Sequence, residues 1–309
     1  MLIYNYPQNK KTGGECVLAL GFFDGVHIAH RELILAARSA AEERGLPFGI
    51  FSFSGGIKGG SARIYTEREK CEIFASLGAH FTVLADFSAI KDCSAESFVK
   101  DILVGELKCS LCVAGFNFRF GRGALGDASL LSSLMREAGG DAIIKSEVTE
   151  GGLTVSSTRI RDLLLSGDIK RANALLGSPY YIKGRVERGR GVGRTLGFPT
   201  LNLPFDGGVA LPRCGVYSSA VALGSKIYSA ITNIGTCPTF EGRPVHSESY
   251  IFDFEGNAYG EEVKVFLLDF LREEMAFSSV EELKMQINID KNKIILANGD
   301  KKWQELGLK

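Results

Sequence analysis

The chain has 309 residues, of which 45% are hydrophobic and 23% charged, and its 36 Lys and Arg balance its 36 Asp and Glu. This composition excludes a disordered or collagen-like chain, because there is enough apolar side chain for a core and Pro occurs only 8 times. A neutral chain is also atypical of a protein that binds duplex nucleic acid, which normally carries a basic excess. The 37 glycines exceed the usual share of about 7% and indicate sharp turns or loops that approach a ligand closely.

Length and cysteine content indicate the general class of the protein. A chain of 309 residues is expected to form about two domains. No stretch approaches the ~18 apolar residues of a membrane helix, and the first residues lack the order of a signal peptide. The seven cysteines are scattered, and the close pair Cys109 and Cys112 lies in an apolar run typical of a buried strand, with a redox or zinc role as the alternative. We therefore expect a cytoplasmic protein without a disulfide framework.

The first half of the chain alternates between short apolar runs and amphipathic stretches. The apolar runs predict buried strands at 16–23, 48–53, 81–86, 110–115 and 142–148. The stretches between them predict helices at 31–45, 66–78, 94–107 and 127–140. Thr66 and Glu69 have the spacing of a capping box, and Gly78 fits the end of the same helix. This alternation predicts a doubly wound parallel sheet, whose ligands bind at the carboxyl ends of the strands near the switch in strand order.

The pattern changes at about residue 180. Strand-like runs follow one another at 216–223, 226–232, 249–254 and 262–268, separated by short turns rich in Gly, Asn and Pro. A long helix is predicted only from Ser279, where Glu282 completes the spacing of a second capping box. We therefore expect a small β-barrel with a C-terminal helix, and we place the domain limits at 1–178 and 179–309.

The segment GFFDGVHIAH, residues 21–30, joins the first strand to the first helix. His27 and His30 stand at i and i+3 and share one face of the first helical turn, where free backbone N–H groups favour an anion such as phosphate. Two imidazoles there are suited to donate hydrogen bonds to a triphosphate. Two surface histidines are the alternative, and a zinc site is disfavoured because no third ligand is close in sequence.

Two further clusters end strands of the same half. In the segment SSTRIR, residues 156–161, hydroxyl side chains precede two arginines at a helix start, which favours phosphate binding, with an N-cap and solvated arginines as the alternative. The segment GFNFRFGRG, residues 115–123, combines aromatic side chains, Arg and Gly, as expected where a planar ring is bound. An aromatic loop packed on the core is the alternative for this segment.

Together the three segments GFFDGVHIAH, GFNFRFG and VSSTRIR resemble the FMN adenylyltransferase domain of prokaryotic bifunctional riboflavin kinase/FAD synthetases, over roughly residues 15–175. The resemblance implies that His27, His30 and Arg159 act in adenylyl transfer, with Mg²⁺ neutralising phosphate charge. It implies ATP contacts by Gly21, Phe23, Asp24, Gly25, Ser157 and Thr158. It implies flavin contacts by Asn117, Phe118 and Arg122.

Two positions depart from the family pattern. Ala29 stands where the family usually has Gly before the second histidine. Residues 54–60 read SGGIKGG, where the family has a Pro-His-Pro element. These departures keep open a second interpretation, in which the chain is a riboflavin kinase with an impaired adenylyltransferase domain.

The second half carries its own candidate site. Residues 183–197 contain five Gly among basic residues, which is typical of a loop that wraps phosphate, with a solvated basic hairpin as the alternative. Thr200 and Asn202 follow at i and i+2 on an extended segment, so both oxygen ligands face one side, as Mg²⁺ bound to a nucleotide requires. A kinase that acts on an alcohol also needs a carboxylate to accept the proton, and the residue pattern leaves Glu248 and Asp253 open.

GRGVGRTLGFPTLN, LPRCGVY, TNIGTCPTF and ESYIFDFEGNAYG resemble, in this order, the riboflavin kinase domain of the same family, which is a six-stranded barrel with a terminal helix. The resemblance implies that Thr200 and Asn202 bind Mg²⁺-ATP and that Glu248 is the base. The glycines assigned to ATP are Gly189, Gly191 and Gly193. The expected function is the conversion of riboflavin to FMN and then FAD, with a non-catalytic flavin or nucleotide sensor as another alternative. The expected partners are riboflavin, FMN, FAD and ATP, without nucleic acid or membrane, and homo-oligomerisation stays open.

Overall fold

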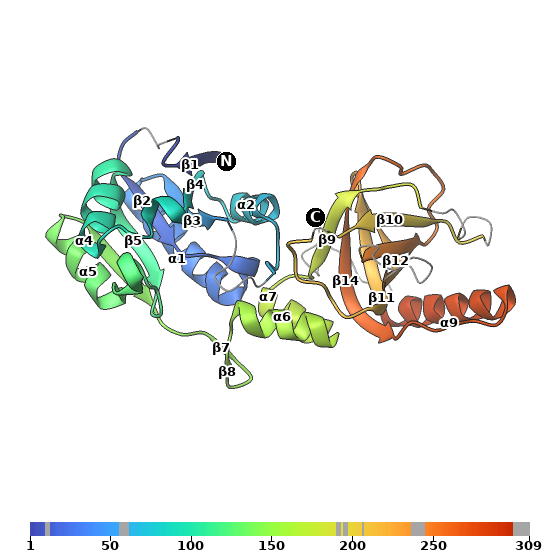
Figure 1. Ribbon diagram of the computed structural model, residues 1–309. Coiled ribbons are helices and arrows are strands. Elements are labelled where there is room, and N and C mark those ends of the chain that lie inside the picture. The colour runs from blue at the N-terminus through green and yellow to red at the C-terminus, as the bar shows by residue number, and fades with distance from the viewer. Residues whose placement is uncertain are drawn as a thin grey trace. The chain divides into compact units, whose positions relative to one another are not determined.

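The computed structural model describes residues 1–9, 13–55, 62–189, 193, 197–205, 207–235 and 245–298. The chain divides into two compact units, Met1–Ser157 and Thr158–Lys309, and each is described by itself (Figure 1). The second unit therefore includes the helices that precede the domain limit proposed from the sequence at residue 178. None of the helices in the described ranges is long and apolar enough to cross a membrane.

The first unit is built on a six-stranded parallel sheet with the order β1-β4-β3-β2-β5-β6. Its strands are β1 (Leu2–Tyr6), β2 (Cys16–Leu20), β3 (Phe48–Ser54), β4 (Phe81–Asp86), β5 (Cys109–Gly115) and β6 (Asp141–Lys145). The predicted parallel sheet and its five predicted strands are confirmed. The edge strand β1 was not predicted, because its first residues are exposed and the short run LIYNY carries no periodicity.

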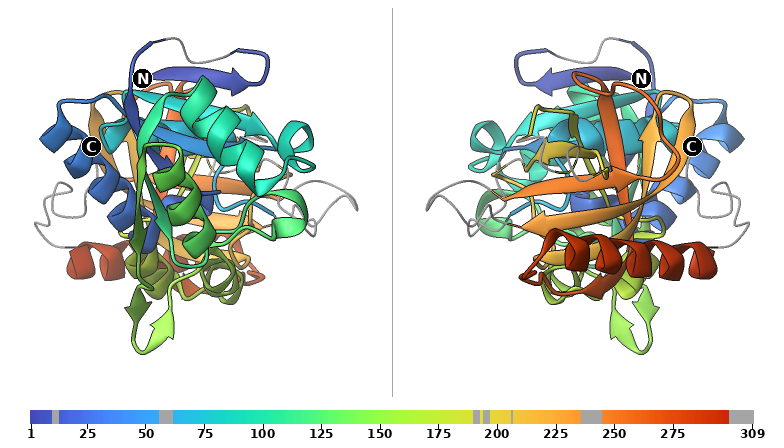
Figure 2. Two further views of the ribbon diagram at one scale, coloured as in Figure 1. Left: turned by 90° about the vertical axis from the view of Figure 1, so that its left-hand side faces the viewer. Right: turned by 90° about the vertical axis from the view of Figure 1, so that its right-hand side faces the viewer.

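Helices cover both faces of this sheet (Figure 2). They are α1 (Ile28–Arg44), α2 (Glu67–Ser76), α3 (Phe87–Ile90), α4 (Ala95–Ser97) with its π-helical continuation η2 (Phe98–Glu106), and α5 (Ala128–Glu137). Val17 and Ala19 of β2 pack in one buried cluster with side chains of α1 and α2, whereas Leu18 and Leu20 pack in another with η2 and α5. Because successive side chains of β2 point to opposite faces of the sheet, this strand contributes to both layers of the core.

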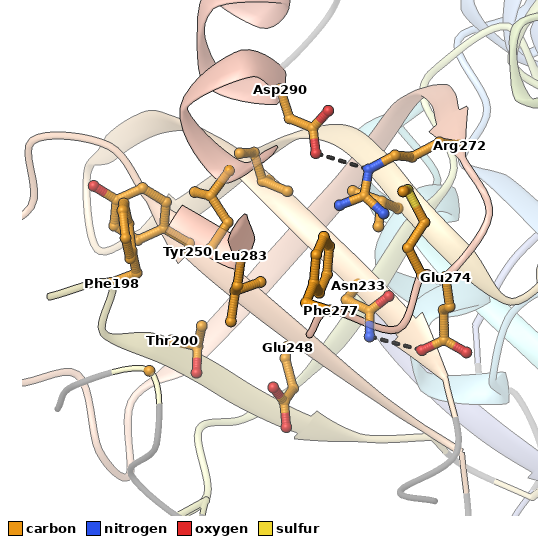
Figure 3. Close-up of a pocket in the computed structure, with 15 residues that line it drawn as sticks. Phe198, Thr200, Asn233, Glu248, Tyr250, Arg272, Glu274, Phe277, Leu283 and Asp290 are labelled. Atoms are coloured by element: carbon orange, nitrogen blue, oxygen red, sulfur yellow. Dashed lines mark hydrogen bonds and ion pairs between the residues drawn. The ribbon is translucent and has the colours of Figure 1, made fainter. Parts of the chain in front are cut away.

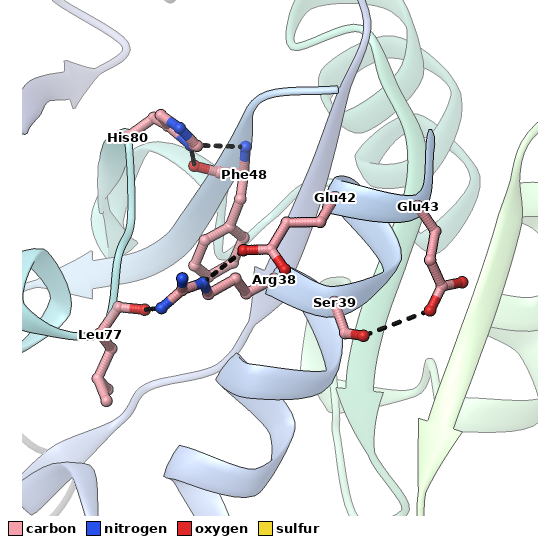
Figure 4. A network of polar contacts seen from close by, with 7 residues as sticks. All are labelled: Arg38, Ser39, Glu42, Glu43, Phe48, Leu77 and His80. Carbon is pink, nitrogen blue, oxygen red and sulfur yellow. Dashed lines mark hydrogen bonds and ion pairs between the residues drawn. The ribbon is translucent and has the colours of Figure 1, made fainter. Parts of the chain in front are cut away.

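Local polar contacts fix how the helices join the sheet. The predicted capping box is present, since Thr66 accepts from the Glu69 N–H while the Glu69 carboxylate accepts from the Thr66 N–H. At the other end of α2, Arg38 of α1 donates to the Leu77 carbonyl, and His80 accepts from the Phe48 N–H at 3.1 Å (Figure 4). His80 thus links the segment between α2 and β4 to the first residue of β3.

The second unit is a nearly closed antiparallel barrel with the order β10-β13-β12-β11-β14-β9. Its strands are β9 (Tyr181–Arg185), β10 (Thr200–Pro204), β11 (Gly215–Leu223), β12 (Lys226–Gly235), β13 (His246–Ile251) and β14 (Glu262–Arg272). A bridge between Glu187 and Asn202 brings the segment after β9 next to β10. The predicted six-stranded barrel with a terminal helix, α9 (Val280–Asn298), is confirmed.

Three further helical contacts complete this unit. The helices α6 (Ser157–Ser166) and α7 (Ile169–Leu176) precede the barrel, and Asn173 of α7 donates to the Leu267 carbonyl of β14 at 2.8 Å. Ile294 of α9 packs with Val216, Ile231 and Phe252 in a buried cluster. At the start of α9, Ser279 accepts from the Glu282 N–H as predicted, while the Glu282 carboxylate accepts from Ser278 instead.

The strand β13 has two chemically different faces. Ser247, Ser249 and Ile251 are buried, whereas His246, Glu248 and Tyr250 are partly exposed. Inside the barrel, the Ser249 hydroxyl is hydrogen-bonded to Thr232 at 2.8 Å, and Thr232 to Ser219 at 2.7 Å. The opposite face of the strand carries Glu248 and Tyr250, which line the pocket of this unit described below.

Candidate active sites

The sheet of the first unit carries a cavity of about 370 Å³ at the carboxyl ends of its strands. Gly21, Phe22 and Phe23 line it after β2, and residues Gly115 to Arg119 line it after β5. Because β2 lies between β3 and β5, the strand order switches direction here. The cavity therefore lies where the sequence predicted a ligand site, and we call it the sheet pocket.

The two histidines of the sheet pocket are stacked on each other. Their ring centroids are 3.5 Å apart and the rings are 15° from parallel. His27 is the N-cap of α1, and its Nδ1 accepts from the His30 N–H at 3.4 Å, so its own proton belongs on Nε2. Burial lowers the pKa of His27 to about 4 and that of His30 well below its usual value. Both rings are therefore neutral at pH 7 and offer N–H groups without a full charge.

The loop before these histidines is held by buried hydrogen bonds. Asp24 Oδ1 accepts from the Ile64 N–H at 3.0 Å, and the Asp24 carbonyl accepts from the Ser157 hydroxyl at 2.9 Å. Asp24 and Gly25 are buried beside the pocket, whereas Ser157 lines it. Thr158 and Arg159 follow Ser157 in α6 and belong to the second unit. Their predicted roles stay predictions.

Only some of the residues predicted to contact the flavin line the sheet pocket. Asn117 and Phe118 line the sheet pocket. Arg122 does not, because its guanidinium donates to the Asp92 carbonyl at 3.0 and 2.8 Å. Arg119, which the sequence reasoning passed over, does line the pocket. Ala29 also lines it, while residues 56–60 of the glycine-rich segment lie outside the described residues.

The second unit contains a cavity of about 270 Å³ between the barrel and α9, which we call the barrel pocket (Figure 3). Leu283 and Ile287 of α9 line one side, and strand residues such as Val216 and Ile231 line another. Phe198 and Tyr250 add an edge-to-face aromatic pair with centroids 5.1 Å apart. A largely apolar cavity with a few polar groups is the usual form of a site for a planar organic substrate.

Of the two carboxylates that the residue pattern left open, Glu248 lines the barrel pocket. Its side chain is 43% exposed, and Oε1 lies 3.2 Å from Nε2 of His246, a neighbour that sequence reasoning missed. In the strand register, Asn202 and Asn233 flank Glu248 on either side. Asp253, the other carboxylate left open by the sequence, is 91% exposed and lies near Lys291 instead.

The glycine loop approaches the predicted magnesium ligands closely. A Cβ at Gly193 would lie 2.4 Å from the Phe198 carbonyl and 3.4 Å from the Thr200 hydroxyl. A Cβ at Gly189 would lie 2.4 Å from the Asn202 amide nitrogen. Thr200 lines the pocket and Asn202 stands two residues along β10 on the same face. Gly191 lies outside the described residues.

The oxygen atoms of Thr200 and Asn202 determine which kind of metal ion could bind here. Among the described residues, no group of three or more His, Cys, Asp or Glu is arranged to hold one. Hydroxyl and amide oxygens such as those of Thr200 and Asn202 suit Mg²⁺ that is already bound to phosphates. The pair therefore fits a nucleotide-bound cation rather than a site made entirely by protein.

A buried ion pair is part of the lining of the barrel pocket. Arg272 Nε donates to Asp290 Oδ2 at 2.9 Å, and Gln286 donates to Asp290 Oδ1 at 2.9 Å. Asp290 is 1% exposed. In the same pocket, Asn233 donates to Glu274 at 3.0 Å. Neither contact was predicted, since each joins residues that are at least 18 positions apart in the chain.

Comparisons with known proteins cover both units. The riboflavin kinase family model matches residues 176–296, and the FAD synthetase family model matches residues 9–159. The bifunctional riboflavin kinase/FMN adenylyltransferase of Escherichia coli K12 is 36% identical over 93% of this chain and 94% of its own. That of Bacillus subtilis is 33% identical over 93% of each. A crystal structure from Streptococcus pneumoniae, described as a macrolide-efflux protein, matches with a TM-score of 0.86 and 31% identity over 94% of this chain and 98% of that one.

Proposed function

Because this chain belongs to the family of bifunctional riboflavin kinase/FMN adenylyltransferases and has both activities, we propose a place for each reaction. Riboflavin is phosphorylated in the barrel pocket, and FMN is adenylylated in the sheet pocket. The matches to both domains over most of the chain do not favour an impaired first domain or a non-catalytic sensor.

In the barrel pocket, Glu248 is the proposed general base. Its carboxylate accepts the proton of the terminal ribityl hydroxyl while that oxygen forms a bond to the γ-phosphorus of ATP. The bond from the γ-phosphorus to its bridging oxygen breaks, and ADP leaves. Thr200 and Asn202 would hold Mg²⁺, which supplies charge neutralisation on the phosphates when bound. The backbone N–H groups around Gly189, Gly191 and Gly193 would receive the phosphates.

In the sheet pocket, a phosphate oxygen of FMN bonds to the α-phosphorus of ATP, and pyrophosphate leaves. No protein nucleophile is needed for this exchange. His27 and His30 are proposed to donate neutral N–H groups to phosphate oxygens as charge shifts onto pyrophosphate. Ser157, Thr158 and Arg159 are the proposed additional phosphate donors.

The remaining contacts of the sheet pocket concern the nucleotides. Asn117 and Phe118 are proposed to contact the flavin nucleotide, and Arg119, which lines the pocket, is proposed to take the role predicted for Arg122. Gly21 and Phe23, which line the pocket, are proposed to contact ATP, and Asp24 and Gly25 are proposed to shape the loop between them and α1. We further propose a cytoplasmic location and no nucleic-acid partner, in keeping with small-molecule substrates.

The observation that carries the kinase proposal is the position of Glu248 in the barrel pocket beside Asn202. With riboflavin, ATP and Mg²⁺, and flavins separated by chromatography, Glu248→Gln should slow FMN formation by about 10²–10⁴-fold, the usual contribution of a general base. The same variant should still convert supplied FMN to FAD. Asp253→Asn is the matched control and should behave as the wild type. FMN formation at the normal rate by Glu248→Gln would refute the assignment of the base.

The sheet pocket is tested by the converse experiment. His27→Ala and His30→Ala should slow FAD formation from FMN and leave FMN formation unchanged. Addition of EDTA should stop both reactions, and excess Mg²⁺ should restore them. Normal FAD formation by both histidine variants would refute the place proposed for adenylyl transfer.

A further inference from the structure

A buried lysine lies directly behind the wall of the sheet pocket. Lys70, on α2, is only 6% exposed. Its Nζ donates to the Phe22 carbonyl at 3.2 Å, the Ser52 hydroxyl at 3.0 Å and the Phe53 carbonyl at 3.2 Å. All three ammonium hydrogens are thus used, which is what a buried cation requires. None of the roles described above uses this residue.

The three acceptors lie where two parallel strands separate. The ladder between β2 and β3 ends at the pair Leu20 and Phe51. Two residues further along the chain in each case stand Phe22 and Phe53, which would be the second pair beyond it in the same register. Their carbonyls instead both accept from Lys70, and the Ser52 hydroxyl also donates to the Phe22 carbonyl at 2.9 Å. The ammonium therefore replaces the backbone hydrogen bonds that the separating strands no longer make to each other.

The residues held in this way form an aromatic wall of the pocket. Phe22 and Phe53 both line the sheet pocket, and their rings are stacked with centroids 6.3 Å apart and planes 17° apart. The Lys70 ammonium is 5.1 Å from the centroid of the Phe22 ring. Lys70 itself is not among the lining residues. Its effect on a bound nucleotide must therefore pass through these two residues.

We propose that Lys70 is a positioning residue for adenylyl transfer, which holds the backbone of Phe22 and Phe53 so that their rings meet a planar ring of a nucleotide substrate. The proposal rests on the proposed function of the sheet pocket. It adds a residue that is not among those lining the pocket and that acts through the aromatic wall.

The first test replaces the ammonium by a methyl group of similar reach. Lys70→Met should raise the KM for FMN or ATP in adenylyl transfer and lower kcat/KM by on the order of 10- to 100-fold, as expected when a positioned substrate shifts. The kinase activity of the same molecules should stay within about twofold, which measures the amount of protein whose second unit is intact. Lys100→Met is the matched control, because Lys100 is exposed in the same unit and forms a surface ion pair with Glu137. It should leave both activities unchanged.

The readout separates positioning from loss of folded protein. If Lys70 served stability alone, Lys70→Met would reduce the fraction of folded first unit, so kcat would fall while both KM values stayed constant. That result would overturn the proposal. Ser52→Ala removes one acceptor and leaves the two carbonyls, so it should give a smaller rise in the same KM. Normal adenylyl transfer by His27→Ala and His30→Ala would instead refute the pocket assignment itself, whatever Lys70→Met does.

The pH dependence of the two activities in the wild-type protein offers a second test. Burial lowers the pKa of Lys70 to about 8, although Glu67 and Cys71 on α2 and Asp24 before α1 oppose the shift. Arg63 adds to the shift, and His30 of α1 also interacts with Lys70. The neutral amine has two hydrogens for three acceptors, so adenylyl transfer should fall relative to kinase activity as pH rises through about 8. In Lys70→Met this ratio should not change over the same range, and an identical change in both proteins would overturn the proposal.

Discussion

The ion pair between Arg272 and Asp290 should control how firmly α9 closes the barrel pocket. Asp290 lies on α9 and Arg272 ends β14, so their contact joins the helix to the barrel. Asp290→Ala removes the acceptor of two hydrogen bonds and leaves a guanidinium that is only 18% exposed. Removal of one partner from a buried pair typically costs about 3–5 kcal/mol.

The lower end of that range applies here, because Arg272 still donates to the Glu273 carbonyl. A cost of about 3 kcal/mol corresponds to a change of on the order of 100-fold in the equilibrium between docked and undocked α9. Amide hydrogen exchange should show this directly, as a loss of protection of that order across residues 283–294. The KM for riboflavin should rise, since Leu283 and Ile287 line the pocket, while adenylyl transfer should not change.

Two controls make the argument refutable. Asp253→Ala removes an exposed partner of Lys291, also on α9, and should alter protection by less than about threefold because surface ion pairs contribute little. The double substitution Arg272→Met with Asp290→Leu should recover much of the protection, since apolar replacement of a buried pair is often neutral. If Asp290→Ala exchanges like the wild type, the ion pair does not hold the helix and the reasoning is wrong.

Three other predictions concern single residues of the two pockets. His246→Ala should lower the kcat of riboflavin phosphorylation several-fold, and His246→Gln, which keeps an N–H donor to Glu248, should restore most of it without a change in KM. Gly193→Ala should raise the KM for ATP in the kinase assay, because its Cβ would lie 2.4 Å from the Phe198 carbonyl. Burial lowers the pKa of His27 to about 4 in the folded chain, whereas a histidine of the unfolded chain has a pKa of ~6.5. Between these two pH values the unfolded chain therefore binds a proton that the folded chain does not. Denaturant titration should therefore show the first unit losing up to about 3 kcal/mol between pH 7 and pH 4, and a smaller loss in His27→Asn.

Much of the fold could be predicted because its signals are local. The alternation of β2 and the capping box at Thr66 and Glu69 each depend on residues close in sequence. The same holds for His27 and His30, which share one helical turn and which the structure brings together. Continuous segments of sequence therefore indicate both pockets, without reference to contacts between distant strands.

The residues that were missed are those whose partners are distant in the chain. Lys70 contacts residues 17 to 48 positions away, and in sequence it is an ordinary polar residue of an amphipathic helix. Asp290 has the same character on α9. Arg122 and Arg119 could not be told apart, because a loop of aromatic and glycine residues does not reveal which arginine turns away. The topology, not the local pattern, decides these roles.

The chain of hydroxyls inside the barrel has a consequence for the proposed base. Side chains of a strand alternate between faces, so a slip of β13 by one residue would turn Glu248 into the barrel interior and Ser249 out of it. The bonds from Ser249 to Thr232 and from Thr232 to Ser219 can form in only one alignment of β11, β12 and β13. A buried hydroxyl that loses its partner is costly, so misaligned strands are penalised. Three buried hydroxyl side chains therefore favour a single register of these strands, and this register determines that the Glu248 carboxylate faces the pocket.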